Sequence, residues 1–127
     1  MQGKSWLPLL KDTPTQWRKS FLAEYFYERG FPNTPTVIAV RTADAKLIKY
    51  PGHADWTELF DLKSDPYEIK NLVHDKSHQK LFEQMNAEFE AQLKAAAYRV
   101  PENADRPEDD QKSPGPKQGK KKKKAEQ

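Results

Sequence analysis

Residues 58–72, ELFDLKSDPYEIKNL, constrain the fold most, because a short apolar run ends there at a strongly specified turn. A run this short and apolar suits a strand better than a helix. Asp65, Pro66 and Glu68 then form a helix-start signature. Asp65 can serve as N-cap, Pro66 suits the first helical position, and Glu68 can reach back to the Asp65 N–H. We therefore expect a strand, a capped turn and a short helical piece.

Three further segments have the composition of strands. Residues 20–27 are rich in aromatic side chains, and their apolar residues on both faces predict a central place in a sheet. Residues 36–41 are mostly β-branched, residues 46–50 form a third strand, and residues 56–62 a fourth. The connections are short, and the first contains GFPNTP at 30–35. Three hairpin-like links predict an antiparallel meander.

The apolar period changes to that of a helix from about residue 75 or 77 to residue 98. Leu81, Met85, Phe89 and Leu93 recur every four residues, and charged residues occupy the other faces. A helix packed on one face of a four-stranded antiparallel sheet is a stable two-layer arrangement. The sequence thus predicts an α+β domain in which this stripe belongs to the core and not to a groove for a partner.

Composition divides the chain into a folded domain at 1–100 and a disordered, charged tail at 101–127 that carries the lysine run 120–124 near its end. The tail has almost no apolar residues, so it cannot offset about 1–2 kcal/mol of backbone ordering entropy per residue. A mean hydropathy of −1.04 agrees with a small core plus such a tail. Because the tail has no aromatic residue to stack on bases, the lysine run suits a solvated end or weak contact with anions.

The sequence motif at residues 58–72 is more specific than a strand followed by a turn requires. It resembles the pattern E-L-Y-D-L-x-x-D-P-x-E-x-x-N-L near the C-terminus of formylglycine-dependent sulfatases of the arylsulfatase and N-sulfoglucosamine sulfohydrolase type, with Phe60 in place of the Tyr. GKSWLPLL at 3–10 and PTVIAVRTADAKLIKYPG at 35–52 resemble two further segments of that family in the same order. The resemblance covers about residues 2–98. It implies the small C-terminal subdomain of the alkaline-phosphatase-like sulfatase fold.

The resemblance also implies chemistry that this sequence does not carry. In the family, a Cys or Ser within C-x-P-x-R or S-x-P-x-R becomes formylglycine, and carboxylates of the large domain hold calcium. This chain has no Cys and no S-x-P-x-R, and its serines lack the G-x-S-x-G elbow. We therefore expect a sulfatase C-terminal fragment that is inactive alone. Formylglycine, calcium and the main contacts with a sulfated glycan would belong to a catalytic domain outside this sequence.

Four basic residues are candidates for the rim of a substrate pocket, because cations near the strand turns can pair with sulfate or carboxylate groups on a sugar. The alternative is that they lie on a solvated strand face. They are Arg41, Lys46, Lys49 and His53. We assign no catalytic, cofactor-binding or metal residue, since the three histidines do not form a zinc pattern such as H-E-x-x-H.

Three functions remain open at this point: a sulfatase fragment, a stand-alone accessory module that binds a glycan or a protein, and a weak nucleic-acid binder acting through its basic tail. The sequence argues against the last. No stretch approaches the roughly 18 apolar residues of a membrane span. Although the family is often exported or lysosomal, no export signal follows Met1. Trp6 and the leucines beside it would anchor a surface that belongs to the larger domain.

Overall fold

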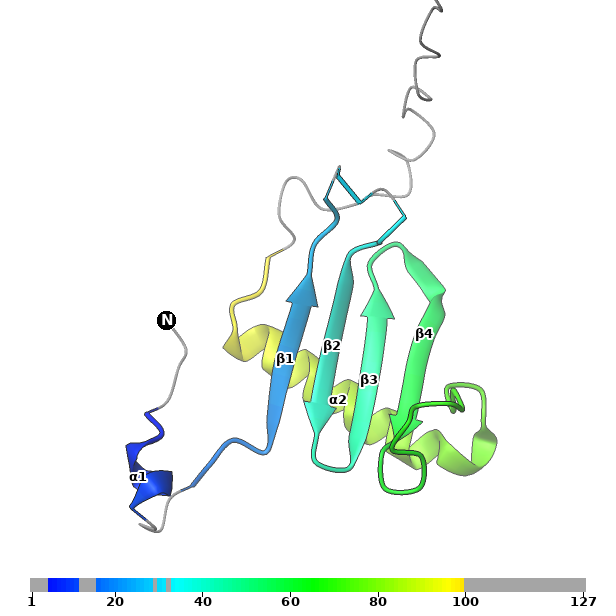
Figure 1. Ribbon diagram of the computed structural model, residues 1–127. Helices are drawn as coiled ribbons and strands as arrows, with labels where there is room; N and C mark the ends of the chain where they lie inside the picture. The colour runs from blue at the N-terminus through cyan, green and yellow to red at the C-terminus, as the bar shows by residue number, and fades with distance from the viewer. Residues whose placement is uncertain (1–4, 12–15, 29, 32, 100–127) are drawn as a thin grey trace, which may run out of the picture.

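A computed structural model describes residues 5–11, 16–28, 30, 31 and 33–99 (Figure 1). The expected tail at 101–127 lies outside these residues. No helix in the described part is long and apolar enough to cross a membrane. In chain order the elements are α1 (Leu7–Leu10), β1 (Ser20–Tyr25), β2 (Val37–Thr42), β3 (Ala45–Tyr50), β4 (His53–Asp61), the 3-10 helix η1 (Lys76–His78) and α2 (Gln79–Ala95).

The four strands form one antiparallel sheet in the order β1-β2-β3-β4, which confirms the predicted meander. Val40 of β2 lies opposite Leu47 of β3, which in turn lies opposite Leu59 of β4. Strand β1 is at an edge, so the central position predicted for it was wrong. Only one face of β1 contributes to the core: Leu22 packs against it, whereas Phe21 on the other face remains 45% exposed.

Helix α2 lies across one face of the sheet (Figure 1). Met85 and Phe89 are its buried residues, with Leu81, Phe82 and Leu93 packed around them, so the predicted stripe is core. Fully burying a side chain of this size contributes about 1.5–3 kcal/mol. The sheet and the segment after it complete this cluster with Ile38, Val40, Ala45, Leu47, Leu59 and Leu72.

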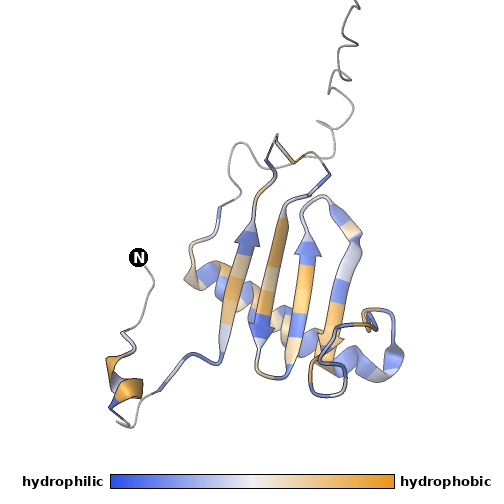
Figure 2. Ribbon diagram, viewed as in Figure 1, coloured by the Kyte–Doolittle hydropathy of each residue, from blue (hydrophilic) through white to orange (hydrophobic). Residues whose placement is uncertain are grey.

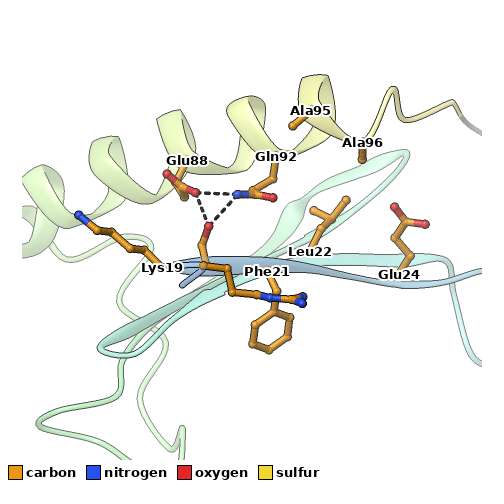
Figure 3. A pocket seen from close by; sticks show the side chains of 10 residues that line it. Lys19, Phe21, Leu22, Glu24, Glu88, Gln92, Ala95 and Ala96 are labelled. Carbon is orange, nitrogen blue, oxygen red and sulfur yellow. Dashed lines mark hydrogen bonds between the residues drawn. The ribbon is translucent and has the colours of Figure 1, made fainter. Parts of the chain in front are cut away.

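The opposite face of the sheet, which we call the open face, has a smaller apolar cluster to which α2 contributes no residue. Hydrophobic residues, drawn in orange, occur in the strands of the sheet (Figure 2). On β1, Leu22 points toward α2 and Phe21 points away from it (Figure 3). The buried members on the open face are Ala39, Ile48, Phe60 and Leu62, with Val37 and Tyr50 packed against them.

The helix expected to start at Asp65 does not form, and residues 62–64 and 66–67 make turns instead. The Asp65 carboxylate accepts a hydrogen bond from the Lys70 N–H at 2.8 Å. Glu68 has a φ of 56°, in the left-handed region, and its side chain reaches Lys46 on β3. The capping prediction was wrong because the ion pair across the sheet and the left-handed backbone take Glu68 out of a first helical turn.

Asn71 attaches the returning segment to β4. Its Oδ1 accepts hydrogen bonds from the N–H groups of Leu59 and Val73, each at 3.0 Å, and its Nδ2 donates to the Thr57 carbonyl at 3.1 Å. The Leu72 N–H then donates to the Leu59 carbonyl at 2.8 Å. These bonds satisfy backbone groups along the outer edge of β4, a role that a neighbouring strand would otherwise fill.

Candidate functional site

Arg41 and Lys46 are the two expected rim residues that the structure brings together. They are directly opposite across β2 and β3, on the open face. Glu68 forms an ion pair with Lys46, and its other carboxylate oxygen lies 4.0 Å from Nη1 of Arg41. One carboxylate thus faces two cations, and the Arg41 side chain is 46% exposed. This group, which we call the Glu68 cluster, keeps a surplus positive charge at the surface.

Lys49 lies on the other face of the sheet and does not join this cluster. Its Nζ donates to Oδ1 of Asn86 at 2.6 Å and lies 3.5 Å from a carboxylate oxygen of Glu90. The same ammonium group is 4.4 Å from the centre of the Phe89 ring. All three partners belong to α2, so Lys49 joins β3 to the helix. Lys49 therefore lies apart from Arg41, on the opposite face of the sheet.

His53 is also separate, because it begins β4 at the far end of the sheet from the Glu68 cluster. Its ring stacks on Trp56, with centroids 4.0 Å apart and planes inclined by 9°. Trp56 in turn meets the edge of Tyr50 at 5.8 Å. This end of the open face is therefore an aromatic surface, where His53 contributes a ring in contact with Trp56.

The sequence reasoning missed Glu68, Tyr67 and Ile69 as residues of the site. Tyr67 and Ile69 flank Glu68 and are among the most exposed large apolar side chains of the described part. The sequence did contain a signal for this site, because two large apolar residues are uncommon in a short polar surface loop. The signal was overlooked because a helix starting at Asp65 was expected, and in such a helix Tyr67 and Ile69 could have packed against the core.

A second polar group lies between β1 and α2 (Figure 3). Ser20 donates a hydrogen bond to Glu88, while Nε2 of Gln92 donates to the Ser20 hydroxyl at 2.8 Å and to Glu88 at 3.0 Å. The Ser20 bond, followed by the Gln92 bond, lowers the pKa of Glu88. No imidazole base is among these partners of Ser20, so its hydroxyl is not activated as a nucleophile here. The three hydrogen bonds instead hold β1 against α2.

The carboxylates of the described part do not gather into a metal site. Within residues 5–11, 16–28, 30, 31 and 33–99, no three His, Cys, Asp or Glu side chains are placed to hold a metal ion. Asp75 illustrates the local use of carboxylates here. Bonds from the hydroxyl and N–H of Ser77 hold its pKa at about 2, and the group caps η1. The described residues therefore offer no donor set for a calcium ion.

Comparison with known proteins points to one family. The family described as N-sulphoglucosamine sulphohydrolase, C-terminal, matches residues 1–95. An N-acetylglucosamine-6-O-sulfatase of Bacteroides thetaiotaomicron is 36% identical over 78 residues, which cover 57% of this chain and 13% of that protein.

Two solved structures have the same fold. One, a protein in complex with its substrate D-glucosamine-2-N,6-O-disulfate, is 29% identical with a TM-score of 0.66, over 73% of this chain and 19% of the other. The second, a 2-O GAG sulfatase, is 24% identical with a TM-score of 0.63, over 82% and 23% of the two chains. The chain thus spans less than a quarter of each relative.

Proposed function

We propose, since the chain belongs to the C-terminal family of N-sulphoglucosamine sulphohydrolase, that it serves as the C-terminal subdomain of a sulfuric ester hydrolase acting on sulfated glycans. The match over residues 1–95 is the observation that carries this proposal, because it includes the whole sheet and α2. The chain corresponds to the C-terminal part of a sulfatase, and the catalytic part is separate. In this proposal that part supplies the nucleophile and the metal.

The names of the relatives support a sulfated aminosugar as substrate. The curated relative is a 6-O-sulfatase of N-acetylglucosamine, and the first solved structure holds a disulfated glucosamine. Within this chain, Arg41 is the residue best suited to touch such a ligand. Its half-exposed guanidinium shares one carboxylate with Lys46, and its planar donors suit sulfate or carboxylate oxygens.

The experiment uses the longest polypeptide that the gene encodes around this chain. We expect its reading frame to contain C-x-P-x-R or S-x-P-x-R and the purified polypeptide to release sulfate from glucosamine 6-sulfate. The isolated chain should release none above buffer, with or without calcium. An Arg41→Ala variant should raise KM more than it lowers kcat, and exposed Lys80→Ala on α2 is the control.

Two outcomes would overturn the proposal. One is a reading frame that lacks both motifs. The other is sulfate release by the isolated chain that follows it through purification from a host without sulfatase. If the long polypeptide is active and Arg41→Ala leaves KM unchanged, the rim role of Arg41 fails while the subdomain role stands.

A further inference from the structure

We infer that the open face and the turn around Glu68 form the surface that docks onto the sulfatase catalytic domain. This inference rests on the proposed function, and it adds which face of the subdomain the partner covers. We call this surface the docking face. Its exposed apolar side chains are Phe21, Trp56, Tyr67 and Ile69.

Exposed apolar side chains are distributed unevenly over the two layers. Tyr67 is 85% exposed, Ile69 83%, Trp56 46% and Phe21 45%. Apart from Trp6, the leucines of α1 and Phe31, these four are the large apolar residues that the described part leaves exposed, and none belongs to α2. Helix α2 therefore has none of the exposed large apolar side chains of the described part, whereas the docking face carries four. Exposed apolar surface of this kind marks interaction sites.

The structure places Phe21 and Trp56 on the open face and the turn that carries Tyr67 and Ile69 beside it. Phe21 points away from α2 (Figure 3). The ring of Trp56 meets Tyr50, which packs on the open-face cluster. Tyr67 and Ile69 flank Glu68, whose carboxylate is bound to Lys46 and faces Arg41 on the same face. The turn thus borders the open face and extends it beyond β4.

Glu68 holds this turn in an unfavourable backbone conformation. Its φ of 56° lies in a region that residues with a Cβ rarely adopt. The ion pair with Lys46 and the bond from Lys70 to Asp65 hold the turn in place. Such backbone strain collects at functional segments, and here its result is that two large apolar side chains extend into solvent.

A catalytic domain fits this surface better than a second copy of the chain. The relatives are four to eight times longer than the part they share with it, so in them the subdomain has a large neighbour. The Glu68 cluster keeps a surplus positive charge, and a symmetric pair would bring two such clusters into one interface. We therefore expect the partner surface to be apolar opposite Phe21, Trp56, Tyr67 and Ile69.

Hydrogen exchange tests this inference. In the longest encoded polypeptide, amides of β1, β4 and residues 66–70 should exchange at least about tenfold more slowly than in the isolated chain. Amides of α2 should change much less. Equal exchange at the docking face in both proteins would overturn the inference, and so would protection that appears in the isolated chain as its concentration rises.

A paired substitution adds a second readout. Tyr67→Ser with Ile69→Ser should lower the thermal midpoint of the long polypeptide and leave that of the isolated chain nearly unchanged, because both side chains are solvated there. Phe31→Ser, which removes an exposed ring outside the docking face, is the matched control. A midpoint that falls equally in both proteins would reject docking. Loss of sulfatase activity with a normal exchange pattern would count against the proposed function alone.

Discussion

Lys46 and Glu68 form an ion pair that joins the middle of the sheet to the turn after β4. The turn lies 22 residues further along the chain, and the pair is partly buried on both sides. Because Glu68 is bound there, it adopts a left-handed backbone conformation, and its neighbours Tyr67 and Ile69 project into solvent. The ion pair thus fixes the conformation of the turn, although a partly exposed pair contributes little to the free energy of unfolding.

Substitution of Glu68 separates the ion pair from the backbone strain. Glu68→Ala should destabilise the chain, because it removes the ion pair and keeps a Cβ at φ 56°. Glu68→Gly also removes the pair, yet relieves about 1 kcal/mol of strain. We expect Gly to be the more stable of the two variants in urea unfolding. Equal midpoints would show that the turn relaxes when the carboxylate is lost.

Asn71 should contribute to stability well beyond the ordinary value for an exposed polar residue. Asn71→Ala removes three hydrogen bonds and leaves the N–H of buried Leu59 without its partner. The expected cost is about 1–3 kcal/mol. Gln79→Ala, which loses one surface bond to Glu83, should cost under about 0.5 kcal/mol. A small effect at Asn71 would mean that water replaces its side chain at the β4 edge.

The α2 stripe gives a direct test of the two-layer core. Phe89→Ala should cost about 3–5 kcal/mol, since the ring is buried against the sheet and lies beneath the Lys49 ammonium. Glu90→Ala, an exposed neighbour with one ion pair to Lys49, should cost under about 0.5 kcal/mol. Thermal midpoints that do not differ between these variants are incompatible with the observed packing.

Acid should destabilise the chain in part through Asp75. Its pKa is about 2 in the folded chain against an ordinary 3.8, because Ser77 donates two hydrogen bonds to the carboxylate. A lowered folded-state pKa means that the contribution is present above about pH 4 and is lost as the pH falls through about 2. Asp75→Asn should therefore reduce the fall in thermal midpoint between pH 5 and pH 2. A parallel fall in both proteins would contradict this role.

The α1 segment should make the isolated chain self-associate. Trp6, Leu7 and Leu10 are exposed, and burying such apolar side chains against another copy is favourable. Sedimentation of the chain should show dimers or larger species, and changing these three residues to Ser should give monomers. Monomer at high concentration, with no binding of a hydrophobic dye, would oppose the prediction.

Local sequence determined the elements and their layers, since alternation, turn residues and a four-residue apolar repeat are short-range properties. The stripe through Met85 and Phe89 is core as predicted, and strands β2 and β3 begin within one residue of their expected positions. The family wording of residues 58–72 likewise identified the sulfatase relationship, which the comparison confirms.

Tertiary structure decided which residues meet. Lys49 differs from Lys46 by three positions, and this odd spacing puts the two lysines on opposite faces of β3, so one binds α2 and the other Glu68. Asp65 and Glu68 satisfy a helix-cap pattern locally, yet their observed partners are Lys70 and Lys46. Local patterns specify what a segment can form. Only the packed sheet supplied the partner that made Glu68 adopt a left-handed turn in place of a helix.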